Sequence, residues 1–93
     1  FNIILEATEK LAKNKSVRSV ILFGIYAKLI QTENSDIDIA VIIGNNTKKQ
    51  ADKIKKEIRK SNKKIELHFF EEKDMKADDP LIKDILRNGK IIL

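Results

Sequence analysis

Apolar residues recur along this chain with two spacings, which predict helices and strands in alternation. In residues 2–14 they fall three and four positions apart, as they do along one face of an amphipathic helix. The segments that follow Thr47 and Pro80 have the same helical spacing. Three other stretches are dense in β-branched residues and predict strands, at 17–24, 36–43 and 65–70.

Residues that favour helix ends mark the second half of the chain. Thr47 is expected to be an N-cap, because its side-chain oxygen can accept from the first backbone N–H groups of a helix. Asp79 and Pro80 are placed as an N-cap and the first helical residue. Gly89 is placed as the C-terminal stop of this last helix. Four residues give the last helix its apolar face: Leu81, Ile82, Ile85 and Leu86.

A short helix at 25–30 and a short strand at 91–93 complete the expected order α-β-α-β-α-β-α-β. This order predicts the α/β class, as a mixed sheet with flanking helices. The length of 93 residues predicts a single small domain that covers residues 1–93.

Composition narrows the class of protein further. The chain has no cysteine, which excludes a disulfide framework or a Cys-type zinc site and fits the cytoplasm. Its net charge of +5 indicates an anionic partner, although a lysine-rich helix face in contact with solvent is the preferred explanation. No apolar run approaches the roughly 18 residues that cross a membrane. The chain begins at Phe1 without a signal-peptide pattern, and we expect a few residues upstream of it.

Asp36 and Asp38 are the strongest chemical signal in the sequence. Side chains two positions apart on a strand point to the same side, so both carboxylates lie together at the start of the second strand. Two such charges repel unless a cation lies between them, and Mg²⁺ prefers oxygen ligands. The alternative is a pair of solvated aspartates. The opposite face of the strand is expected to join the core through Ile37, Ile39, Val41 and Ile43.

Three other residues could belong to the same site. Glu66 joins the two aspartates as a third carboxylate if the third strand lies beside the second; otherwise it is a solvated glutamate. His68 lies on the same face as Glu66, but a partly buried strand histidine is the preferred interpretation. Gly24 ends the first strand, where a glycine lets the backbone approach a phosphate, although it is more often only a turn residue.

Two stretches in this order resemble the nucleotidyltransferase superfamily of the DNA polymerase β-like fold. They are Leu22-Phe23-Gly24-Ile25-Tyr26-Ala27-Lys28 and Asn34-Ser35-Asp36-Ile37-Asp38-Ile39-Ala40-Val41. The family signature is a strand that ends in Gly-Ser, a gap of about ten residues, and Asp-x-Asp on the next strand. The later Ile65-Glu66-Leu67 corresponds to the position of the third carboxylate. The resemblance extends over nearly the whole chain and is strongest to the minimal nucleotidyltransferases of prokaryotes.

The resemblance implies transfer of a nucleoside monophosphate, AMP, from an NTP such as ATP to an acceptor. Asp36, Asp38 and Glu66 would be the catalytic residues and would bind Mg²⁺ or Mn²⁺. The triphosphate would meet the segment with Gly24, Ile25 and Lys28. The minimal proteins are often paired with a helical HEPN partner in toxin–antitoxin modules, where AMP is added to a partner tyrosine.

The sequence departs from the family pattern in the phosphate-holding segment. Ile25 stands where the family has serine, and Leu29 stands where it usually has glycine. Loss of one such donor can lower the rate by a factor on the order of 10²–10³. The alternative to an enzyme is therefore a catalytically impaired binding module, an antitoxin-like partner with the same fold. A plain nucleic-acid binder ranks last, because the interleaved aromatic residues that stack on bases are missing.

Overall fold

The computed structural model describes residues 2–24, 37–76 and 78–93, which form one mixed sheet with helices on both faces. The predicted fold class is confirmed. The predicted short helix at 25–30 lies outside the described residues, as do Asp36, Ile25, Lys28 and Leu29. None of the helices in the described segments is long and apolar enough to span a membrane.

Four strands form the sheet in the order β3-β2-β1-β4. Their bounds are Val17–Phe23 for β1, Ile37–Ile43 for β2, Ile65–Glu71 for β3 and Lys90–Ile91 for β4. β1 runs antiparallel to β2 and β4, whereas β2 and β3 are parallel. A parallel pair needs a crossover connection, and here the crossover contains α2, Ala51–Ser61.

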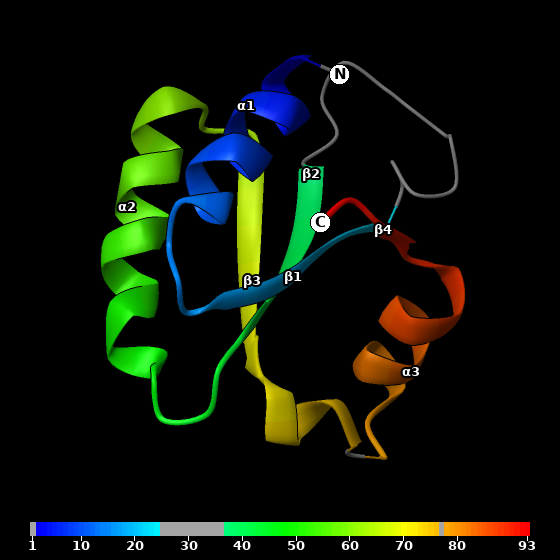
Figure 1. Ribbon diagram of the computed structural model, residues 1–93. Helices are drawn as coiled ribbons and strands as arrows, with labels where there is room; N and C mark the ends of the chain where they lie inside the picture. The colour runs from blue at the N-terminus through cyan, green and yellow to red at the C-terminus, as the bar shows by residue number, and fades with distance from the viewer. Residues whose placement is uncertain (1, 25–36, 77) are drawn as a thin grey trace.

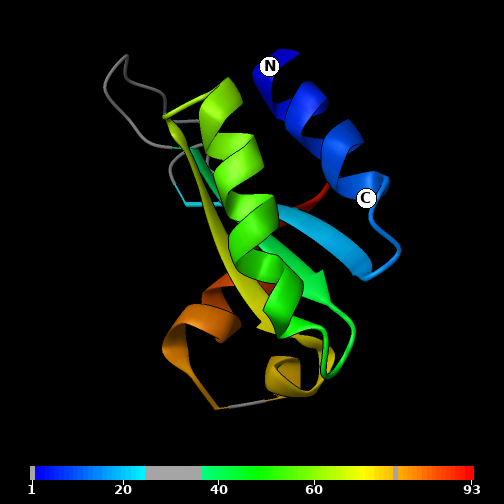
Figure 2. The ribbon, with the colours of Figure 1, turned by 90° about the vertical axis from the view of Figure 1, so that its left-hand side faces the viewer.

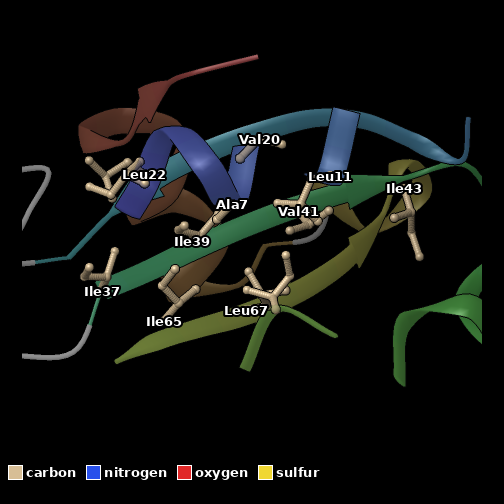
Figure 3. Packing of buried hydrophobic residues seen from close by; sticks show 12 residues of the cluster. Ala7, Leu11, Val20, Leu22, Ile37, Ile39, Val41, Ile43, Ile65 and Leu67 are labelled. Carbon is tan, nitrogen blue, oxygen red and sulfur yellow. The ribbon is translucent and has the colours of Figure 1, made fainter. Parts of the chain in front are cut away.

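The first helix, α1 (Asn2–Ala12), packs with α2 on one face of the sheet, and α3 (Pro80–Asn88) covers the other (Figures 1 and 2). The predicted alternation along β2 is confirmed, since every second side chain enters the core beneath α1 (Figure 3). The buried members of this core are Ile4, Ala7, Leu11, Val20, Leu22, Ile37, Ile39, Val41, Ile43, Ile58, Ile65 and Leu67.

A second, smaller cluster lies between the sheet and α3. Its buried members are Ile21, Phe23, Ala40, Ile42 and Ile85. Of the four apolar residues expected to face the core from α3, Ile82 and Ile85 are buried. The side chains of Leu81 and Leu86 are instead exposed, because the short helix presents only a narrow stripe to the sheet.

The ends of the helices agree with the sequence in α3 but not in α2. The Asp79 side chain accepts from the backbone N–H groups of Leu81 and Ile82, so this N-cap is confirmed. Thr47 stands at the N-cap position of the turn that precedes α2, but its predicted side-chain cap is wrong, because the hydroxyl donates back to the Gly44 carbonyl and makes no cap hydrogen bond. A 3-10 turn, Lys48–Gln50, intervenes before α2.

The last glycine does end α3. The Gly89 N–H donates to the Ile85 carbonyl at 2.9 Å. Its φ of −70° is ordinary, so conformational freedom is not the reason for glycine here. A Cβ at this position would collide with the Ile85 carbonyl and with Ile21 of the sheet. Glycine is therefore needed at position 89 because the end of α3 approaches β1 closely.

Candidate functional site

The starts of β2 and β3 lie side by side and bring two carboxylates together. In the parallel register Asp38 pairs with Glu66, one position after the pair formed by Ile37 and Ile65. The two isoleucines enter the core beneath α1 and α2, so the carboxylates lie on the other face of the sheet. β3 therefore lies beside β2, which is the condition for Glu66 to be the third carboxylate of the site.

The side chain of His68 completes a cluster with these carboxylates. Asp38, Glu66 and His68 each offer one ligand atom, and the three atoms lie within 4.8 Å of one another. His68 Nε2 is 3.1 Å from Asp38 Oδ1. Glu66 is exposed, whereas the side chains of Asp38 and His68 are each 29% exposed. The cluster is thus open to solvent on one side and supported by protein on the other.

An aromatic contact holds the histidine ring in place. Phe23, at the end of β1, lies opposite Asp38 in the antiparallel register. Its ring meets the His68 ring nearly edge to face, with centroids 5.1 Å apart and planes inclined by 68°. Phe23 is itself buried in the cluster beneath α3. The imidazole therefore has a packed side and a polar side, and its Nε2 lies on the side of Asp38.

Gly24 lies against the second oxygen of the same carboxylate. Its φ of +74° is in the left-handed region that favours glycine. A Cβ at this position would lie 2.8 Å from Asp38 Oδ2, a distance that side chains do not adopt. The Asp38 carboxylate is therefore placed between the Gly24 backbone at Oδ2 and the His68 ring at Oδ1.

The donor set fits a divalent cation. Carboxylate oxygens suit Mg²⁺ and Mn²⁺, and an imidazole nitrogen is a common transition-metal ligand. Asp38 and Glu66 carry like charges whose repulsion a cation would relieve. A side chain at position 24 would press against Asp38 Oδ2, and glycine avoids this clash. The residues present therefore fit the metal site expected from the sequence.

Some predicted site residues cannot be placed. Asp36, Ile25 and Lys28 lie outside the described residues, so their assignments stay predictions. For His68 the sequence favoured a partly buried strand histidine over a site residue. The residue is partly buried, as expected, and it also contacts Asp38, from the face of β3 that it shares with Glu66.

A hollow elsewhere on the molecule does not coincide with this cluster. Its volume is about 710 Å³, and it lies between α1 and α2, on the other face of the sheet. Lysines 10, 13 and 53 contribute to its walls, together with Glu57. The acidic and imidazole groups described above do not line it. We therefore take the cluster at the strand starts as the candidate site.

Replacing Gly24 by alanine is expected to disturb the site and the fold together. The left-handed backbone costs a non-glycine residue roughly 1–2 kcal/mol, and the new Cβ would push Asp38 away. We expect a lower free energy of unfolding in urea and a weaker affinity for Mn²⁺.

Gly44→Ala is the matched control. There the atoms nearest to a Cβ would belong to the flexible Arg18 side chain, at 3.4 Å, and the backbone is not left-handed. Equal losses of unfolding free energy and of Mn²⁺ affinity in the two variants would contradict the requirement for glycine at position 24.

Comparison with known proteins agrees with the fold. Residues 6–93 match the sequence profile of a family described as polymerase beta, nucleotidyltransferase. The search of curated proteins finds no significant match. One similar structure is a protein from Sulfolobus solfataricus assigned to the nucleotidyltransferases. It has a TM-score of 0.64 and 16% identity, and the match covers 97% of this chain and 76% of that one.

A second similar structure belongs to a toxin–antitoxin system and was determined with AMP-PNP. Its TM-score is 0.67 at 20% identity, and the match covers 99% of this chain and 71% of that chain. At these identities the two structures support the fold alone. The evidence for the family is the match to the sequence profile.

Proposed function

Because the chain belongs to the polymerase beta nucleotidyltransferase family, we propose that it transfers a nucleoside monophosphate, AMP, from ATP to an acceptor. The observation that carries this proposal is the meeting of Asp38 and Glu66 at the starts of two parallel strands, with Gly24 against Asp38. We also propose a cytoplasmic location, where ATP would be available to the protein.

The carboxylates have different tasks in the proposed reaction. Asp36 and Asp38 hold Mg²⁺ or Mn²⁺, and Glu66 adds a third oxygen ligand. The bound ion supplies charge neutralisation for the phosphates and orients them. Glu66 is the more exposed member of the described pair, which favours contact with an incoming acceptor. It positions the acceptor hydroxyl or accepts its proton.

The covalent step exchanges one P–O bond for another. The acceptor oxygen attacks the α-phosphorus of ATP and forms a new P–O bond, while the bond to the bridging oxygen between the α- and β-phosphates breaks. Pyrophosphate leaves with the electron pair of that bond, and the acceptor proton passes to Glu66 or to water. The Gly24 backbone, with Ile25 and Lys28 in the following segment, contacts the triphosphate in this proposal.

The acceptor that we propose is a protein partner. The similar toxin–antitoxin structure was determined with AMP-PNP, an ATP analogue, which suits both a nucleotide site and a protein complex. By the family resemblance, the partner is a helical HEPN-type protein that receives AMP on a tyrosine. Nucleic acid is not proposed as the acceptor.

A second candidate function is a binding module without catalysis. Ile25 favours it, since an isoleucine offers no hydroxyl to a phosphate oxygen where the family has serine. In that case the protein acts as an antitoxin-like partner, and its metal site serves nucleotide binding only.

Transfer from ATP labelled at the α-phosphate separates the two functions. The protein is incubated with Mg²⁺, labelled ATP and a HEPN-type partner, and labelled partner is measured after electrophoresis. We expect Ile25→Ser to raise the transfer rate by about 10²-fold or more, since it restores a phosphate donor. Absence of labelled product with both forms would contradict the enzyme and favour the binding module.

A further inference from the structure

His68 is the member of the cluster that the proposed reaction leaves without a task. It is the only histidine in the chain. Its ring is held by the edge-to-face contact with Phe23, and its Nε2 lies 3.1 Å from Asp38 Oδ1. Glu66 is two residues before it on β3 and therefore points to the same side of the sheet. The ring is thus fixed with Nε2 beside the Asp38 carboxylate, on the side of the sheet to which Glu66 also points.

The short contact between His68 and Asp38 constrains what can lie there. A nitrogen lone pair and a carboxylate oxygen 3.1 Å apart repel each other unless a proton or a cation lies between them. The Glu66 carboxylate adds a second negative charge, and one ligand atom from each of the three residues lies within 4.8 Å of the other two. An Nε2–H group would satisfy this contact as a hydrogen bond, whereas a divalent cation bound by all three side chains would also relieve the repulsion between the two carboxylates.

A nitrogen ligand changes which cation the site prefers. Mg²⁺ demands oxygen ligands in near-ideal octahedral geometry, and it usually keeps several waters. Mn²⁺ accepts the same carboxylates and, as a transition metal, gains more from an imidazole nitrogen. We propose that His68 Nε2 is a metal ligand together with Asp38 and Glu66, and that it makes this site prefer Mn²⁺ to Mg²⁺. This inference rests on the metal site of the proposed function.

Pulsed electron paramagnetic resonance of the Mn²⁺-loaded protein tests the ligand directly. A directly bound imidazole gives a characteristic nitrogen coupling, and because the untagged chain has one histidine, this coupling can come only from His68. We expect the coupling in the original protein and its loss in His68→Gln. Bound Mn²⁺ without imidazole coupling would overturn the proposal.

Calorimetry with Mn²⁺ and Mg²⁺ separates ligation from positioning. Glutamine at position 68 keeps an N–H donor for Asp38 but removes the imidazole nitrogen. We expect His68→Gln to lower the Mn²⁺ affinity about 10-fold while the Mg²⁺ affinity stays close to its original value. An equal loss for both ions, or no change for either, would overturn the proposal.

Asp38→Asn distinguishes failure of this inference from failure of the proposed function. If Asp38→Asn loses both ions while His68→Gln leaves the ratio of affinities unchanged, the metal site stands and the role of His68 is wrong. If Asp38→Asn keeps both affinities, the metal site itself is wrong. Thermal unfolding followed by circular dichroism confirms that each variant is folded.

Discussion

Asp38→Asn is expected to abolish measurable Mg²⁺ and Mn²⁺ binding and to lower AMP transfer by a factor on the order of 10²–10³ or more. The substitution keeps the size of the side chain but removes the charge that lies between His68 and Gly24. It also relieves the repulsion between Asp38 and Glu66, so the fold should be retained. Calorimetry of metal binding and transfer of labelled AMP measure the two losses.

Asp52→Asn is the matched control for this experiment. Asp52 is an exposed aspartate on α2, a helix that packs against the other face of the sheet. Its neutralisation changes the net charge by the same amount, and we expect metal binding to remain. Undiminished metal binding by Asp38→Asn, or an equal loss in Asp52→Asn, would contradict the assignment of the site.

Ile39→Ala should produce the largest loss of stability among the substitutions considered. Ile39 is 0% exposed, in the middle of β2, and packs beneath α1 (Figure 3). Truncation of a buried isoleucine to alanine costs about 2–5 kcal/mol, because transfer free energy is lost and a cavity remains. Domains of this kind are stable by only about 5–15 kcal/mol, so a large part of the total would disappear. Urea unfolding measures the change.

Ile91→Ala provides the comparison on the same sheet. Ile91 lies in the edge strand β4 and is 75% exposed, so its truncation leaves no cavity. We expect its effect to stay within about 0.5 kcal/mol. A similar loss for both variants would mean that Ile39 is not in a closely packed core.

The local pattern of apolar and polar residues was sufficient to predict most of the helices and strands that the structure describes. Alternation along β2 separates Ile39 from Asp38 whatever the rest of the fold does, because successive strand residues point to opposite faces. The Asp79 cap is likewise local, since its side chain accepts from N–H groups two and three residues later.

Thr47 shows where local reasoning failed. Its hydroxyl can bond either forward to a helix or back to the Gly44 carbonyl, and the structure adopts the second. The turn that precedes Thr47 is held by a residue distant in the sequence, because the Asn46 N–H donates to the Glu71 carboxylate of β3 at 2.5 Å. A partner 25 residues away does not appear in a local pattern.

The sequence by itself determined the elements, the core face of β2 and the presence of acidic residues at two strand starts. Tertiary structure alone decided that β2 and β3 are parallel neighbours in the register that sets Asp38 opposite Glu66. It also decided that His68 reaches Asp38 and that the Gly24 backbone closes on its other oxygen. The physical reason is that periodicity and capping act over a few residues, whereas strand pairing joins segments through contacts that no short stretch specifies.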